Sequence, residues 1–314
     1  MRSIKINRDC PNCKSNASKV LFQLEARQFT TINSTYRPDY NEVLGIADDQ
    51  VFPLLRCINC DFVYAGWLPD DNFLELLYDV VIDPNLGLSA SRCLSWLSRL
   101  SYVNSILLKQ IDRSFRDYEN VRVLDYGCGN AFMLETLKIS SDQIHVSGFE
   151  ASKTRLDVLN SKNIKAFNRV ESLLDLKHFH VVILNEVLEH VKDFKEVLST
   201  VYNILEPKGI VWISVPNYSN QRIKTIQNSA IKKQAYPLDL NPWEHLNYFS
   251  PENLREITRE CGFREILNDT LDLGFQPSLK GLERWRNVFG VIVRLLKFTI
   301  TGNQNNTELI LEKK

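Results

Sequence analysis

The sequence predicts an α/β fold: a doubly wound, mostly parallel sheet with helices on both faces, preceded by a small cysteine-containing domain. Two observations support this prediction. Short apolar runs at 121–126, 144–150, 181–184 and 210–215 alternate with segments of helical spacing, a pattern typical of βαβ units. Four of the seven cysteines form two C-x-x-C pairs within the first 60 residues, ahead of the alternating region.

The elements follow in order. After the strand at 121–126 we expect a helix at 132–139, a strand at 144–150, a helix at 152–160 and a short strand at 164–167. The run 181–184 contains only Val, Ile and Leu, which predicts a central strand buried on both faces. Helical spacing over 191–205 precedes a Pro-Lys-Gly turn and the strand at 210–215. Ser250 and Pro251 are typical of a helix start, and Gly262 of its end.

The remaining segments suggest four parts of the chain. Residues 1–68 would form a metal-binding domain, and 69–115 a helical lid or bridge, because 73–79 and 94–111 have helical spacing. Residues 116–270 would form the core, and 271–314 a C-terminal extension whose polar end, 302–314, is expected to be a mobile tail. With 314 residues and 44% hydrophobic content, the chain can bury a large core and a smaller one.

Charge and hydropathy exclude several classes of partner. The 38 Lys and Arg residues equal the 38 Asp and Glu residues, so no overall field favours nucleic acid. The first nine residues are polar and basic, and no apolar run is long enough to cross a bilayer. We therefore expect a soluble, cytoplasmic protein. Residues 285–300 have an apolar side and a narrow basic side, which suits a membrane surface near a lipid-linked acceptor, packing on its own domain or packing on a second subunit.

A glycine-broken turn follows the first strand of the core. In Asp125-Tyr126-Gly127-Cys128-Gly129, the two glycines permit backbone angles closed to other residues and let a ligand lie against the main chain. Asp125 can accept a hydrogen bond from an amino group, and Glu150, at the end of the next strand, can bind two ribose hydroxyls. The third position of a dinucleotide fingerprint is Phe132, which disfavours NAD and favours S-adenosylmethionine.

These motifs, in this order, resemble the class I S-adenosylmethionine-dependent methyltransferases over about residues 100–270. The resemblance rests on V-L-D-Y-G-C-G-N, on Glu150, on Asn185-Glu186-Val-Leu-Glu-His-Val and on the turn after Leu205. It implies a Rossmann-like, seven-stranded sheet. It also implies that the cofactor is bound by the loop of Asp125, Gly127, Cys128 and Gly129, by Glu150, and by Asn185 and Glu186 at the rim of the pocket.

The cysteine pairs predict a metal site. Cys10/Cys13 and Cys57/Cys60 each place two thiolates in one tight turn, and two such turns complete a tetrahedral zinc site. Four protein ligands leave no open position, so the ion would be structural and would stabilise a small domain. Ordinary thiols are the alternative.

Two segments could supply a base for methyl transfer. His190 would sit at a helix start, where the helix dipole favours the neutral base; packing beside the cofactor is the alternative. Glu244, His245 and Tyr248 lie within one short segment after the fifth strand, and His245 could partner His190 or simply anchor the segment.

A cysteine domain ahead of this core, with Glu-His before Tyr-Phe-Ser, resembles the deoxysugar C-methyltransferases and related glycan-pathway methyltransferases. The resemblance implies that His190, Glu244, His245 and Tyr248 form the acid/base group and that the acceptor is a small saccharide, on its own or as a nucleotide- or lipid-linked glycan precursor. Those enzymes carry a further large C-terminal domain, which leaves O-methylation open. An RNA methyltransferase with a zinc ribbon and a non-catalytic binding protein are the competing hypotheses.

Overall fold

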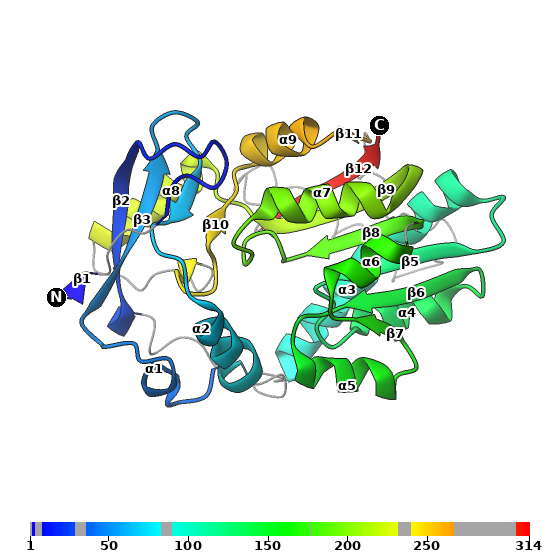
Figure 1. The fold of residues 1–314 in the computed structure, drawn as a ribbon, viewed down its shortest axis with the longest axis horizontal. Coiled ribbons are helices and arrows are strands. Elements are labelled where there is room, and N and C mark those ends of the chain that lie inside the picture. Colours follow the sequence, from blue (N-terminus) through cyan, green and yellow to red (C-terminus); the bar gives the residue numbers. More distant parts are fainter. Residues whose placement is uncertain are drawn as a thin grey trace, which may run out of the picture.

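The structure is a computed structural model that describes residues 2–3, 8–28, 36–82, 90–176, 178–231, 240–266 and 306–314. The predicted amphipathic segment 285–300 lies outside these residues. Two sheets lie side by side, with the cysteine-containing sheet at the left of Figure 1 and the larger sheet at the right. None of the helices described has the length and apolar character needed to cross a bilayer.

The larger sheet has seven strands, as predicted. Its order is β11-β12-β9-β8-β5-β6-β7, and all neighbours from β9 to β7 are parallel. The strands are β5 (Val121–Tyr126), β6 (Ile144–Phe149), β7 (Lys165–Phe167), β8 (Phe179–Asn185), β9 (Leu205–Pro216), β11 (Phe263–Glu265) and β12 (Asn306–Lys313). Chain order reverses between β5 and β8, and ligands of such sheets bind at the carboxyl ends of strands beside that point. The fold class predicted from the sequence is confirmed.

The C-terminal residues contradict the expectation of a mobile tail over 302–314. Residues Asn306–Lys313 form β12, which pairs antiparallel with β9 on one side and β11 on the other. Leu309, Ile310 and Leu311 are buried there. The segment has one short apolar run, at 309–311, between polar residues, and this run completes the core once the neighbouring strands are in place.

Helices cover both faces of this sheet, as side-chain alternation on β8 shows. Val182 and Leu184 pack with α7, whereas Val181 and Ile183 pack with α3 and α4 on the opposite face. The helices of this part are α3 (Ala90–Phe115), α4 (Phe132–Ser140), α5 (Lys153–Ser161), α6 (Val170–Leu176), α7 (Phe194–Ile204) and α9 (Pro251–Glu260). Helix α8 (Asn220–Ile231) lies instead beside the smaller sheet, where Ile223 and Ile226 join the buried cluster of that sheet (Figure 1). The predicted cap of α9 is confirmed, because the Ser250 hydroxyl accepts a hydrogen bond from the Asn253 amide.

The smaller sheet combines strands from the first 65 residues with one strand from a much later part of the chain. It contains β1 (Arg2–Ser3), β2 (Ser18–Glu25), β3 (Gln50–Cys57), β4 (Val63–Ala65) and β10 (Asn247–Tyr248). Its other elements are η1 (Ala26–Gln28) and α1 (Tyr40–Val43). Because β10 follows the core strands in sequence but pairs with β4, the segment that carries Glu244 and His245 is fixed between the two sheets (Figure 1).

A short helical segment crosses between the sheets at the position predicted for a lid or bridge. It consists of α2 (Asp71–Glu75), capped by Asp70, and a π-helical turn η2 (Leu76–Val81). Its contacts with the core include an ion pair from Asp71 to Lys192 at 2.6 Å and a hydrogen bond from the Ser152 hydroxyl to Asp79. π-Helical turns are often found at functional sites.

Candidate functional site

The glycine loop after β5 has the backbone that the sequence predicts. Gly127 and Gly129 have φ values of +80° and +53°, in the left-handed region that disfavours residues with a Cβ. A Cβ at Gly127 would also lie 2.8 Å from Val187 Cγ2. The Cys128 side chain packs into a small apolar cluster with Leu134 and Leu159 beneath the loop. Contact between a cofactor and this residue would therefore involve its main chain.

Glu150 and Asp125 place two carboxyl groups beside this loop. Glu150 accepts hydrogen bonds from the Gly129 amide at 2.9 Å and from the Ser152 amide at 3.1 Å. Asp125 is 4% exposed, and burial together with the nearby charge of Glu150 raises the pKa of its carboxyl to about 7. The Glu150 carboxylate is thus held in one orientation, while Asp125 gains a proton near neutral pH.

The rim predicted at Asn185 and Glu186 lies where β8 ends. The Oδ1 atom of Asn185 is buried and accepts no hydrogen bond from any residue that the structure describes, so a bound ligand could donate to it. Glu186 has φ +55° and accepts a hydrogen bond at 3.0 Å from Asn306 of β12. Asn306 also donates to the Ser214 hydroxyl. These groups, like the glycine loop, fit a polar nucleoside ligand.

His190 lies in a turn rather than at a helix start. α7 begins at Phe194 and is capped by Asp193, so the predicted effect of a helix dipole on His190 is wrong. Nδ1 of His190 lies 2.9 Å from the carbonyl oxygen of Glu244 and 3.3 Å from the hydroxyl of Tyr78. Because a carbonyl oxygen only accepts, the Nδ1 atom must carry a proton in this contact, and Nε2 is the ring nitrogen that could act as a base.

The structure brings His245 to His190, with ring centroids 4.6 Å apart and the rings nearly perpendicular. The Glu244 carboxylate lies elsewhere: it accepts hydrogen bonds from the hydroxyl of Tyr36 and from Asn241 Nδ2. Burial, and then the charge of Glu244, raise the pKa of the Tyr36 hydroxyl well above its usual value. The hydroxyl therefore stays protonated and holds Glu244 in place.

Tyr248 is not brought to this pair of imidazoles. Its ring is 1% exposed, packs 4.8 Å from the ring of Tyr218, and its hydroxyl donates to the carbonyl of Leu240 at 3.4 Å. The phenol beside His190 belongs instead to Tyr78 of η2. Sequence reasoning missed Tyr78 because 112 residues separate it from His190, and no local pattern distinguishes it from a core aromatic residue.

Glu189 was missed as well. Its side chain is 1% exposed, and one ligand atom from each of Glu189, His190 and His245 lies within 4.8 Å of the others. A carboxylate beside two imidazoles can orient a general base, and the same set could hold a divalent cation. The pair Glu189-His190 is visible in the sequence, but the sequence does not show that it lies beside His245.

The four cysteines meet as predicted. Sγ atoms of Cys10 and Cys60 are 3.6 Å apart, and those of Cys13 and Cys57 are 3.5 Å apart. A tetrahedron with zinc–sulfur bonds of about 2.3 Å has edges of about 3.8 Å, so the cluster matches the size of a zinc site made of four thiolates. Burial raises the pKa of Cys60 to about 11 and that of Cys10 further. A cation must therefore replace the protons for all four to be thiolates.

Both cysteine pairs lie in equivalent turns. Lys14 follows the first pair and donates its amide to the Cys10 carbonyl at 2.8 Å, and Asp61 follows the second pair and donates to the Cys57 carbonyl at 3.2 Å. Both residues have φ +60°. Each turn thereby directs its two sulfur atoms to one point.

Comparison with known proteins shows which family the chain belongs to. Residues 93–267 match the family described as methyltransferase domain, so the chain belongs to this family and is an S-adenosylmethionine-dependent methyltransferase. The match favours an enzyme over the hypothesis of a non-catalytic scaffold.

Individual relatives are more distant. The chain is similar to the ubiquinone biosynthesis O-methyltransferase of Rickettsia bellii (strain OSU 85-389), at 26% identity over 192 residues, 59% of this chain and 72% of the relative. The enzyme of the same name from Pelagibacter ubique is 26% identical over 173 residues, 52% of this chain and 70% of that one. These names do not refer to glycans, in contrast to the resemblance drawn from the sequence.

Solved structures give weak matches. The plantazolicin methyltransferase BpumL in complex with S-adenosylhomocysteine is 15% identical, with a TM-score of 0.46, and the match covers 69% of this chain and 84% of that one. A SAM-dependent methyltransferase from Archaeoglobus fulgidus is 19% identical, with a TM-score of 0.41, over 70% of this chain and 99% of that one.

Proposed function

We propose that this chain transfers a methyl group from S-adenosylmethionine to a hydroxyl or an acidic carbon of a small saccharide, on its own or as a nucleotide- or lipid-linked glycan precursor. The observation that carries the proposal is the meeting of His190, His245, Glu189 and Tyr78 between the two sheets. A sugar hydroxyl needs a base to become a methyl acceptor, and it needs polar partners to be oriented.

The cofactor site consists of the groups at the carboxyl end of β5, β6 and β8. The main chain of Gly127, Cys128 and Gly129 would lie against the methionine part, with Asp125 facing its amino group. Glu150 would accept hydrogen bonds from the ribose hydroxyls, while Asn185 and Glu186 border the pocket. S-adenosylmethionine supplies an electrophilic methyl group on a positively charged sulfur.

The acid/base step falls to the imidazoles. The acceptor oxygen or carbon would form a bond to the methyl carbon while the bond between the methyl carbon and the sulfur breaks. The acceptor proton passes to Nε2 of His190, whose Nδ1 proton is held by the Glu244 carbonyl. His245 and Glu189 would share the developing positive charge, and Tyr78 would orient His190. Glu244 acts through its main chain and Tyr248 through packing.

The cysteine cluster would hold a structural zinc ion. Its geometry fits four thiolates and leaves no position for substrate. The ion would stabilise two turns of the smaller sheet, one before β2 and one between β3 and β4.

Isotope transfer tests the acceptor class. The protein is incubated with methyl-labelled S-adenosylmethionine and separate pools of nucleoside-diphosphate sugars, lipid-linked saccharides and quinone-type phenols, and products are read by mass spectrometry. We expect the labelled mass shift in a saccharide pool, and its loss in the His190→Asn variant. Labelling confined to phenols would overturn the saccharide assignment.

A phenolic hydroxyl is the second candidate acceptor. It is supported by the relatives named ubiquinone biosynthesis O-methyltransferase. An RNA acceptor is less well supported because the net charge is zero, and salt-sensitive binding of structured RNA would revive it.

A further inference from the structure

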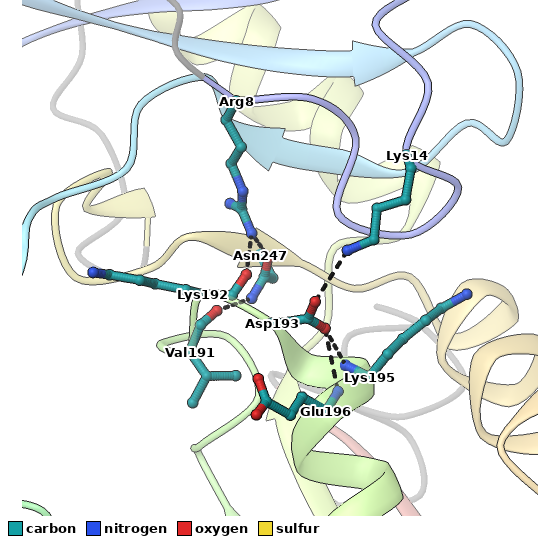
Figure 2. Close-up of polar contacts among 8 residues, drawn as sticks. All are labelled: Arg8, Lys14, Val191, Lys192, Asp193, Lys195, Glu196 and Asn247. Carbon is teal, nitrogen blue, oxygen red and sulfur yellow. Dashed lines mark hydrogen bonds and ion pairs between the residues drawn. The ribbon is translucent and has the colours of Figure 1, made fainter.

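Arg8 connects the cysteine cluster to the segments that carry the two imidazoles. It is 8% exposed, and its hydrogen bonds cross to distant parts of the chain, as Figure 2 shows for two of them. Its guanidinium donates to the carbonyl of Leu246 at 2.8 Å, to Oδ1 of Asn247 at 2.7 Å and to the carbonyl of Lys192 at 3.0 Å. All three acceptors are neutral, so the contacts fix geometry and do not pair opposite charges.

The acceptors belong to the two segments of the acid/base group. Leu246 directly follows His245, and Lys192 lies two residues after His190. A planar guanidinium with several donors in a fixed fork holds both carbonyls at a set separation. Arg8 is therefore one of the groups that set the spacing between the His190 turn and the His245 segment.

Asn247 extends the same connection. Its side chain is fully buried and donates to the carbonyls of Leu188 and Val191 at 2.7 and 2.8 Å, while its oxygen accepts from Arg8. The Glu189 carbonyl in turn accepts from the amides of Leu246 and Asn247 at 2.7 and 3.0 Å. Figure 2 shows that Arg8 reaches this network from the side of the smaller sheet.

The position of Arg8 is set by the metal-binding turn. Only Asp9 separates it from Cys10, whose amide and carbonyl are both held within the turn, by Ser15 and Lys14. A zinc ion on four thiolates has a net charge of about −2, which favours a buried cation two residues away. Binding of the ion would thus fix the Arg8 backbone and attract its side chain.

We propose that Arg8 is a positioning residue for His190 and His245, and that the ion bound by Cys10, Cys13, Cys57 and Cys60 sets the geometry of the acceptor site through it. The proposal rests on the acid/base site and the zinc site proposed above. It gives the smaller sheet a role in catalysis without contact between the metal and the substrate.

Lys14 offers a matched control. It lies in the same turn and also reaches the core, through an ion pair with Asp193 at 3.0 Å (Figure 2). Its side chain is 65% exposed, and such surface pairs contribute little. Removing its charge should leave the imidazoles where they are.

Histidine NMR tests the proposal without a known acceptor. The chain has five histidines, so ring-labelled protein gives five resolvable Cε1–Hε1 signals, assigned by single substitution. In Arg8→Met we expect the His190 and His245 signals to move by more than their linewidth, while those of His145, His178 and His180 stay in place. Arg8→Lys should restore part of the shift because it keeps the charge but not the fork, and Lys14→Met should cause none.

Other outcomes have defined meanings. Unchanged His190 and His245 signals in folded Arg8→Met would overturn the positioning role; if that variant does not fold, Arg8→Lys decides by the same signals. S-adenosylhomocysteine affinity, measured by calorimetry, should change by less than about twofold because none of the acceptors of Arg8 belongs to the cofactor loop. A complete loss of cofactor binding in the unsubstituted protein would instead count against the proposed cofactor site.

Removal of the ion tests the second part of the proposal, the coupling between the metal site and the two imidazoles. Chelation of the unsubstituted protein should move the same two signals, and zinc should restore them. A shift of all five signals would mean that the ion only maintains the fold, and no shift would mean that it is uncoupled from the site; either would overturn the coupling. Co²⁺ substitution serves as a separate readout, because thiolate-to-cobalt absorption is expected only if the cysteines bind metal.

Discussion

At the scale of single residues, the site combines groups that are held by the main chain with groups held by other side chains. Glu150 is fixed by two backbone amides and His190 by a backbone carbonyl. Each oxygen of Glu150 keeps a second lone pair, and Nε2 of His190 takes no part in the contact with the carbonyl, so both groups can still bind a ligand. Substitutions at these positions should therefore affect ligand binding or proton transfer more than folding.

Replacement of Glu150 should weaken cofactor binding. Glu150→Ala removes the acceptor for the ribose hydroxyls and leaves the Gly129 amide without its partner, and hydrogen bonds to charged groups contribute about 1.5–3 kcal/mol each. We expect at least a tenfold loss of S-adenosylhomocysteine affinity in calorimetry. Glu171→Ala, at an exposed ion pair, is the matched control and should bind normally. Equal affinity in both variants would contradict the assignment of Glu150.

The buried carboxyl of Asp125 should make stability depend on pH. Folding raises its pKa from 3.8 to about 7, so its contribution is fully present below about pH 4 and is lost as the pH rises to about 7. In Asp125→Asn this loss should disappear, and urea unfolding should show the variant gaining up to roughly 4 kcal/mol on the unsubstituted protein between pH 4 and pH 8. Asp117→Asn, on the surface, should show no such gain. Parallel pH curves for Asp125→Asn and the unsubstituted protein would refute the expected shift.

At the scale of elements, local patterns predicted the parts of the fold that are determined locally. The strands β5, β6, β8 and β9 and the capped helix α9 were predicted from apolar runs and from Ser250-Pro251. β12 was not, because its apolar run of three residues is too short to predict a strand and forms one only between β9 and β11, far away in the sequence. The start of α7 was misplaced although Asp193 and Glu196 form a capping pattern that marks it.

The candidate site likewise combines features that local sequence determines with features that depend on tertiary packing. The glycine loop, Glu150 and the four cysteines were predictable because each motif requires particular residue types at fixed spacing. Tyr78 and Asn306 carry no local signal, and they reach His190 and Glu186 only through tertiary packing. Tyr248 was predicted to lie near the imidazoles because it is close in sequence, but β10 turns its ring into the core.

Helix α9 provides a test of capping at the element scale. Ser250→Ala removes the acceptor for the Asn253 amide at 3.1 Å and should lower the free energy of unfolding by about 1 kcal/mol, measured with urea. Ser250→Asp keeps a capping oxygen and should lose less than half as much. Equal losses would show that the serine acts through packing instead.

At the scale of the whole molecule, one apolar core continues from the cysteine cluster into the larger sheet. Phe62, two residues after Cys60, packs 5.4 Å from Phe194 and 5.3 Å from Phe249, measured between ring centroids. Cys10 and Cys57 belong to the same buried cluster as Val182 and Leu184 of β8. Since the turns around the cysteines form part of this core, loss of the ion should lower the free energy of unfolding of the whole protein.

Zinc should accordingly contribute to global stability. We expect one zinc ion per chain by elemental mass spectrometry, and a fall of the unfolding temperature by about 5 °C or more when it is chelated, since about 1 kcal/mol corresponds to 2–4 °C in domains of 150–250 residues. Cys10→Ser, which removes a fully buried ligand, should lose the ion and show the same fall without chelator. Cys261→Ser lies outside the cluster and should keep both the zinc and the unfolding temperature. A chain that is free of zinc and equally stable would mean that the four thiols are only packed together, and the coupling inferred through Arg8 would then have no ion to act on.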